Sequence, residues 1–355
     1  MMASLPVRSR IIPGLGLGIL ALGSLGSCTS ARPGIQYEAI ADAHPPVEWP
    51  RAPEPTRIRL LASVARPEDI GARKSIFRRF TELLFGSGEL RRLRRPYGLA
   101  VDREGRLYVA DPDGAGIHVF DPEHGRYRFQ SKAGGYRFRA PIGVAVDPEG
   151  KLYVSDPEQG VVVALDRRGK FRFVLSDGLE RPTGLAWHAG RQQLYVVDTR
   201  GHRVVIFDAA GRKVGSFGGR GVEPGRFNFP TGIAIGPDGT VYLTDSMNFR
   251  IQIFTADGDY LRGFGRHGDG VGDLARPKGI SVDSEGHIYV VEGLYDVVNV
   301  YSPDGALLLS FGGAGRGPGE FWLAAGLVID RRDRVYVADS FNGRVQVFQY
   351  YSQQR

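Results

Sequence analysis

The residues that could carry catalysis or hold a metal ion are few and scattered. The seven histidines show neither an HExxH pattern nor closely spaced ligand pairs; they are His44, His118, His124, His188, His202, His267 and His287. The glycine-rich run 312–319 lacks the Lys-Ser/Thr of a phosphate-binding loop, and no helical pattern follows it. We therefore predict no catalytic residue and no cofactor, and we assign no metal ligand from the sequence.

A second pattern pairs an acid with an arginine five residues later. It occurs three times, as Asp198 with Arg203, Asp245 with Arg250 and Asp339 with Arg344. The recurrence favours a charge-assisted bridge across a turn over acid–base catalysis. Comparable segments have Gly116, Val161 or Val297 in place of the arginine, and one has Glu292 in place of the aspartate. We expect the protein surface to be less regular around those segments.

Basic and aromatic residues form a third candidate set, because they recur beside prolines at similar intervals. These candidate ligand-binding residues are Arg95, Tyr97, Arg139, Arg181, Arg276 and Lys278. If the segments converge, they form a basic, aromatic-edged recognition surface. The alternative is a set of solvated loops with ordinary repeat similarity.

The elements that position these residues follow a six-fold repeat. Pro-x-Gly-apolar-x-apolar recurs around Gly98, Gly143, Gly184, Gly232, Gly279 and Gly326, at intervals of 41 to 48 residues, with Ala324 replacing the last proline. Within 230–265, turn residues separate four short alternating segments. A period of this length built from short strands indicates an all-β, six-bladed β-propeller with four antiparallel strands per blade.

The six repeats resemble the NHL repeat family over residues 93–348, most specifically at the three acid–arginine segments. Six-bladed relatives include lyases and lactonases that hold a metal near the central channel. The resemblance therefore implies an alternative function, a metal-dependent lyase or lactonase-type hydrolase using zinc or calcium at its channel.

The N-terminus is predicted to be a lipoprotein signal peptide over 1–27. Arg8 and Arg10 precede an apolar stretch, and Leu25-Gly26-Ser27-Cys28 resembles a lipobox, which implies cleavage before Cys28 and lipidation of it. Cys28 is the only cysteine, so no disulfide or thiolate metal set competes for it. Thr29 in place of aspartate favours the outer membrane by resemblance to sorting rules.

Four further segments complete the predicted organisation. Residues 28–56 are rich in proline and are expected to form a tether. Residues 57–92 should hold a strand that closes the last blade, over 57–64, and a short amphipathic helix over 75–85. That helix either packs on the propeller or meets a membrane or partner. The propeller spans 93–348, and a polar tail covers 349–355.

Together these features predict an envelope binding or scaffold module more than an enzyme. Loss of the leader lowers the net charge from +7 to +5, so the protein is mildly basic. Export makes nucleic acid an unsuitable partner. The expected partners are an envelope protein or an anionic polysaccharide such as lipopolysaccharide, bound by a periplasmic or surface-exposed monomer.

Overall fold

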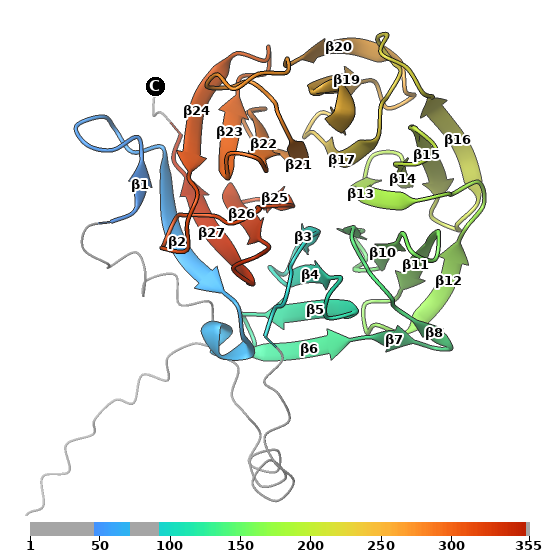
Figure 1. Cartoon of the computed structure of the whole chain (residues 1–355). Helices are drawn as coiled ribbons and strands as arrows, with labels where there is room; N and C mark the ends of the chain where they lie inside the picture. Colours follow the sequence, from blue (N-terminus) through green and yellow to red (C-terminus); the bar gives the residue numbers. More distant parts are fainter. Residues whose placement is uncertain (1–45, 72–91, 353–355) are drawn as a thin grey trace, which may run out of the picture. The chain divides into compact units, whose positions relative to one another are not determined.

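The computed structural model describes residues 46–71 and 92–352. Within these residues six antiparallel sheets of four or five strands surround a central channel, as Figure 1 shows. Each sheet is one blade, and its first strand lies at the channel. This confirms the six-bladed all-β propeller expected from the repeat.

The blades follow one another along the chain. Blade 1 contains β3 (Leu99–Val101), β4 (Leu107–Asp111), β5 (Gly116–Asp121) and β6 (Arg126–Gln130). Blade 2 contains β9 (Val144–Val146), β10 (Leu152–Asp156), β11 (Val161–Leu165) and β12 (Phe171–Leu175). Blade 3 contains β13 (Pro182–His188), β14 (Gln193–Asp198), β15 (Arg203–Asp208) and β16 (Lys213–Gly218). Blade 4 contains β17 (Pro230–Ile235), β18 (Val241–Asp245), β19 (Arg250–Phe254) and β20 (Tyr260–Phe264). Blade 5 contains β21 (Pro277–Val282), β22 (Ile288–Glu292), β23 (Val297–Tyr301) and β24 (Leu307–Gly312).

The second strand of a blade is buried on both of its sides. All five residues of β4, β10, β18 and β22 are buried, because neighbouring blades cover both faces of each sheet. Large apolar side chains accordingly gather between consecutive blades, as Tyr108 and Val154 do between blades 1 and 2. The hydrophobic core is therefore divided among the interfaces between blades.

The last blade is closed by the N-terminal strand. Blade 6 contains β25 (Leu327–Ile329), β26 (Arg334–Asp339) and β27 (Arg344–Tyr350), and β2 (Ile58–Val64) pairs antiparallel with β27. Alternate residues of β2 are buried, which fits the alternation that predicted this strand. Tyr350 pairs with Ile58, so the strand continues into the region expected to be a polar tail.

The end of the proline-rich segment differs from a free tether. The short strand β1 (Glu48–Trp49) pairs with β2 as a fifth strand of blade 6. Trp49 packs against Phe311 and Phe348, with ring centroids 5.8 and 6.0 Å apart. Val47 and Trp49 therefore pack over the interface between blades 5 and 6, and the ion pair of Glu48 with Arg59 adds to the strand pairing.

Smaller elements complete the described residues. They are the hairpin β7 (Lys132–Ala133) with β8 (Tyr136–Arg137) between blades 1 and 2, and the 3-10 turns η1 (Pro67–Ile70) and η2 (Ser246–Asn248). In residues 46–71 and 92–352 we find no helix with the length and apolarity needed to cross a bilayer. The predicted signal peptide, Cys28 and the 75–85 helix lie outside the described residues.

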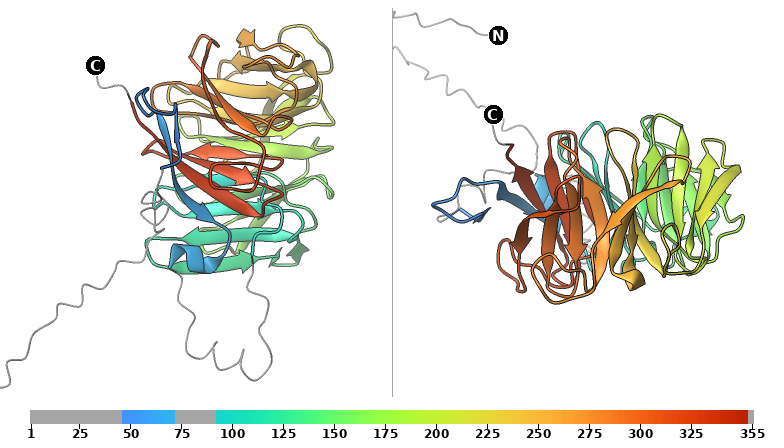
Figure 2. Two further views of the ribbon diagram at one scale, coloured as in Figure 1. Left: turned by 60° about the vertical axis from the view of Figure 1, so that its left-hand side comes forward. Right: turned by 90° about the horizontal axis from the view of Figure 1, so that it is seen from above.

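The strands run between two faces of the ring, so loops gather on those faces (Figure 2). One face, the opening face, carries the loops that immediately precede each first strand and the turns between second and third strands. These opening loops hold Arg95, Tyr97, Arg139, Arg181 and Arg276, and Lys278 is the second residue of β21.

Candidate functional site at the channel mouth

The six repeat glycines bring the first strands into close contact around the channel. A Cβ atom on Gly143 would lie 1.9 Å from the carbonyl oxygen of Thr183 in the next blade. The same contact recurs at every blade, at 1.9 to 2.7 Å, and Gly326 closes the circle on Tyr97. The channel enclosed by these strands has a volume of only about 110 Å³. Ordinary small-molecule pockets hold roughly 300–1,000 Å³, so a ligand is expected at the mouth and not inside.

The acid that ends each second strand holds the opening loop in place. All six acids are buried, and each accepts at least one hydrogen bond from a backbone N–H of its own blade's opening loop. The donor residues at 2.7–2.8 Å are Arg94 to Asp111, Arg139 to Asp156, Arg181 to Asp198, Asn228 to Asp245, Arg276 to Glu292 and Trp322 to Asp339. Hydrogen bonds to a carboxylate are among the stronger ones in proteins. The opening loops are therefore rigidly positioned.

The three predicted acid–arginine pairs are present as ion pairs. Arg250 lies 2.9 Å from Asp245, Arg344 lies 2.7 Å from Asp339, and Arg203 lies 3.3 Å from Asp198. Each arginine also donates to a backbone carbonyl of the connection that leads into its blade. The pairs therefore tie the connection between blades to the second strand, which is a structural role.

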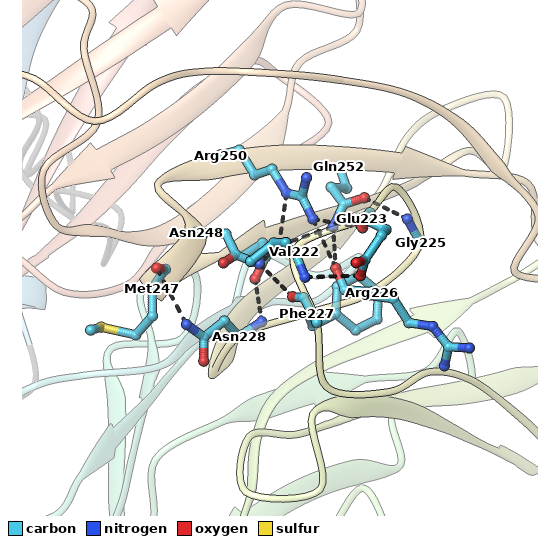
Figure 3. Close-up of polar contacts among 12 residues, drawn as sticks. Val222, Glu223, Gly225, Arg226, Phe227, Asn228, Met247, Asn248, Arg250 and Gln252 are labelled. Atoms are coloured by element: carbon cyan, nitrogen blue, oxygen red, sulfur yellow. Dashed lines mark hydrogen bonds and ion pairs between the residues drawn. The ribbon is translucent and has the colours of Figure 1, made fainter.

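Blades 4 and 6 carry a fuller version of this arrangement, a clamp of Asp, Asn, Arg and Gln. Figure 3 shows it in blade 4, where Gln252 donates to Arg226 O at 2.7 Å and accepts from Gly225 N at 2.9 Å. In blade 6, Gln346 makes the equivalent bonds. The pair pattern alone did not reveal these glutamines. A polar residue at a buried position of an otherwise apolar third strand is the signal that would have found them.

The blades without the arginine use other partners for their acid. In blade 1, the imidazole Nε2 of His118 lies 3.3 Å from Asp111. In blade 2, Gln159 donates to Asp156 at 2.9 Å. In blade 5, Glu292 accepts three backbone N–H bonds. The side chains differ as expected from the sequence, yet the opening loops remain held in the same way.

Tyr97 lies at the mouth of the channel among cations from several blades. Its side chain belongs to the channel lining, as does Lys278 of blade 5. Burial raises the pKa of the Tyr97 hydroxyl. The positive charges of Arg276, Arg181 and Arg95 act in the opposite direction on that pKa, which places all three guanidinium groups near the mouth.

Lys278 is the most unusual charged group of this mouth. Its amine donates to the carbonyl of Ala324 at 3.1 Å. In other blades a hydroxyl makes the equivalent bond, as Ser246 does to Pro277 O. Blade 5 has Gly293 at the hydroxyl position, and the lysine stem fills that space. Burial, reinforced by the nearby charge of Arg276, lowers the pKa of Lys278 to about 8.

The sequence-predicted residues are not all equivalent. Arg181 and Arg276 are exposed and have no ion-pair partner among residues 46–71 and 92–352. Arg95 is paired with Asp113 at 2.8 Å. Arg139 acts on the hydroxyl of Tyr136 and is not among the charges that act on Tyr97. The hairpin β7–β8, which the sequence did not reveal, inserts Tyr136 into the connection before blade 2.

The described residues contain no group of three His, Cys, Asp or Glu side chains placed to hold a metal ion. Individual histidines have structural partners instead. His202 accepts a hydrogen bond from the backbone N–H of Phe229 at 3.2 Å, and His287 lies 3.0 Å from Asp283.

Comparison with known proteins identifies the repeat. Residues 227–254 and 321–348 match the family model described as NHL repeat. The chain carries NHL repeats. The two matched segments are those of blades 4 and 6, whose clamps are complete, so the NHL match and the clamp coincide. No match was found among curated proteins.

Solved structures resemble the NHL propeller in fold. Virginiamycin B lyase from Staphylococcus aureus is 13% identical with a TM-score of 0.55, over 73% of this chain and 96% of the other. Regucalcin from Agrobacterium tumefaciens, described as a calcium-binding protein, is 16% identical with a TM-score of 0.54, over 74% and 92%. An auxiliary nutrient binding protein from Bacteroides thetaiotaomicron is 13% identical with a TM-score of 0.57, over 73% and 70%. At these identities the likeness shows the fold alone.

Proposed function

We propose that this NHL propeller is a non-enzymatic binding module that captures an acidic partner at its opening face. The observation that carries the proposal is the convergence of Arg181 and Arg276 on Tyr97, without ion-pair partners among the described residues. Buried acids hold both opening loops by their backbone, so the arginine side chains are displayed by a rigid frame. Such preorganisation reduces the cost of ordering on binding.

The alternative, a metal-dependent lyase or hydrolase, has less support at this site. The lyase and the calcium-binding protein share the fold at 13% and 16% identity. The channel is narrow, and the charges that act on Tyr97 at its mouth are cations, whereas a metal site would need convergent acids and imidazoles. A purified protein that bound stoichiometric zinc or calcium and lost a lyase activity with a chelator would favour the alternative.

We further propose that the module is held at the outer membrane by lipid on Cys28, facing the periplasm or the cell surface. The lone cysteine in a lipobox-like context supports this proposal. Radioactive palmitate should label the wild-type protein and not Cys28→Ser. Equal labelling of both would contradict the lipoprotein proposal.

Charge reversal at Arg181 and Arg276 together should weaken capture of an anionic probe. We expect the Kd for poly-L-glutamate to rise about tenfold or more, because two converging cations become anions at a rigid site. Biolayer interferometry on the mature chain checks this expectation. The binding should also weaken with salt, since exposed charges are screened beyond about 10 Å at roughly 0.1 M ionic strength.

Arg139→Glu is the control for each single reversal, Arg181→Glu and Arg276→Glu, because it makes the same charge change in the opening loop of blade 2, away from Tyr97. We expect a change in Kd of less than about threefold, with unchanged thermal unfolding in all variants. A similar loss of affinity in the control would show that the effect depends on net charge alone, and it would contradict a specific binding site at the mouth.

The lowered pKa of Lys278 predicts a pH dependence of anion binding. Below about pH 8 the amine is charged and attracts the ligand, and above this pH it is neutral. The affinity for poly-L-glutamate should therefore fall as the pH rises from 7 to 9. Lys278→Met should bind more weakly at pH 7 and lose most of this dependence. A wild-type affinity that stays constant between pH 7 and 9 would contradict a role for Lys278 in binding.

A further inference from the structure

Exposed apolar side chains form an arc on the opening face of blades 4, 5 and 6. The apolar arc consists of Phe229, Met247, Leu294, Tyr295, Trp322 and Phe341, whose exposed fractions lie between 39% and 55%. Isolated apolar residues on a surface are ordinary, but several of them on one face of neighbouring blades indicate an interaction site.

Within each blade of the arc, the turn and the opening loop are hydrogen-bonded to each other. The N–H of Met247 donates to Asn228 O at 3.0 Å, and that of Phe341 donates to Trp322 O at 3.1 Å. In blade 5 the turn that holds Leu294 is bonded to the opening loop of Arg276, through Gly293 N and Arg276 O at 3.1 Å. Arg276 therefore lies inside the arc, so a ligand that reaches it also contacts apolar side chains.

Three residues of the arc are held by contacts with their surroundings. The rings of Trp322 and Phe341 lie 5.6 Å apart, and the guanidinium of Arg316 lies 4.5 Å from the centre of the Trp322 ring. The backbone N–H of Trp322 is held by Asp339, and that of Phe229 by His202. About half of each side chain remains packed in the fold. The arc is therefore suited to contact with a ligand on its surface and not to insertion into a bilayer.

Charge and apolarity together select one class of partner. An anionic polysaccharide would pair with the arginines and could stack sugar rings on the aromatic side chains, but it would leave the aliphatic Met247 and Leu294 without an apolar partner. An anionic bilayer is flat, whereas the cations of the mouth surround a narrow concavity, so the two surfaces do not match in shape. A polypeptide segment with acidic side chains next to aromatic or aliphatic ones complements both halves of the face. Resting on the proposed function, we infer that the partner is such a segment, an acidic amphipathic stretch of a protein.

Two polymers separate the apolar contribution from the charge. Poly-L-glutamate supplies charge alone, and a random copolymer of glutamate and tyrosine of matched charge adds aromatic side chains. We expect the mature wild-type chain to bind the copolymer at least about fivefold more tightly, because burial of aromatic side chains against the arc adds affinity. Leu294→Ser combined with Phe341→Ser should remove this preference and leave binding of poly-L-glutamate within about twofold.

Leu261→Ser with Leu308→Ser is the matched control, because these residues are exposed to 49% and 54% on the outer strands β20 and β24. The control should keep the preference. Equal affinity of the wild type for both polymers overturns the inference, as does tighter binding of dextran sulfate or of phosphatidylglycerol vesicles than of the copolymer. Absence of binding to poly-L-glutamate, in contrast, contradicts the proposed function itself.

Discussion

Gly143→Ala should lower the free energy of unfolding by about 3 kcal/mol or more, the upper part of the usual range for overpacking. The added Cβ would lie 1.9 Å from the carbonyl oxygen of Thr183 and 2.8 Å from the hydroxyl of Ser155. The nearer atom belongs to the backbone of the next blade, so the strain cannot be relieved by a side-chain rotation. Urea unfolding followed by tryptophan fluorescence measures this loss.

Gly135→Ala provides the matched control for this substitution. No atom lies within 4 Å of its Cβ position, and its φ is not positive, so the change in stability should stay within about 0.5 kcal/mol. If Gly143→Ala were equally mild, the ring could expand at little cost, and the glycines would not determine the width of the channel.

Removal of the closing strand should destabilise the ring by about 5 kcal/mol or more. A chain that begins at Arg66 lacks Ile58, Leu60 and Val64, each buried to 99% or more. Burial of one such side chain contributes roughly 1.5–3 kcal/mol. The loss also exposes the edge of β27 to pairing with other chains. We expect a melting temperature at least about 10 °C lower, with aggregation, in differential scanning calorimetry.

A chain that begins at Arg57 separates the two N-terminal strands, because it keeps β2 and loses β1. It should melt only a few degrees below the mature protein, since the lost contacts of Val47 and Trp49 involve partly buried side chains. A chain from Arg66 that melted with the full mature protein would show that β2 does not hold the seam.

The sequence was sufficient to predict the architecture, because the features that determine it repeat six times. Period, turn chemistry and alternation all indicated four-stranded blades, and the alternation in 57–64 predicted the closing strand. The acid–arginine pairs were equally visible because both partners lie within one turn. These features depend on local spacing, which a single chain displays directly.

The arrangement of the candidate site depended on contacts between distant residues. Arg139 stands four residues before its repeat glycine and Arg181 three before its own, but only the hairpin β7–β8 shows that Arg139 has a different neighbour, Tyr136. Lys278 is unusual because Gly293 leaves space for its stem. Strand β1 was not predicted, because two residues are too few to show an alternating pattern. It is held by packing of Trp49 on aromatic rings from two other strands.

The docking of β1 on β2 also determines how the molecule responds to a mechanical load. A pulling force on the chain upstream of residue 46 is transmitted to the propeller first through the two residue pairs between β1 and β2 and through the packing of the Trp49 indole. Once these contacts break, the force acts on Ile58 and separates β2 from β27 one pair at a time, starting beside Tyr350. Tension applied from the N-terminus therefore acts on the seam of blade 6 before it reaches the strands that border Arg181 and Arg276.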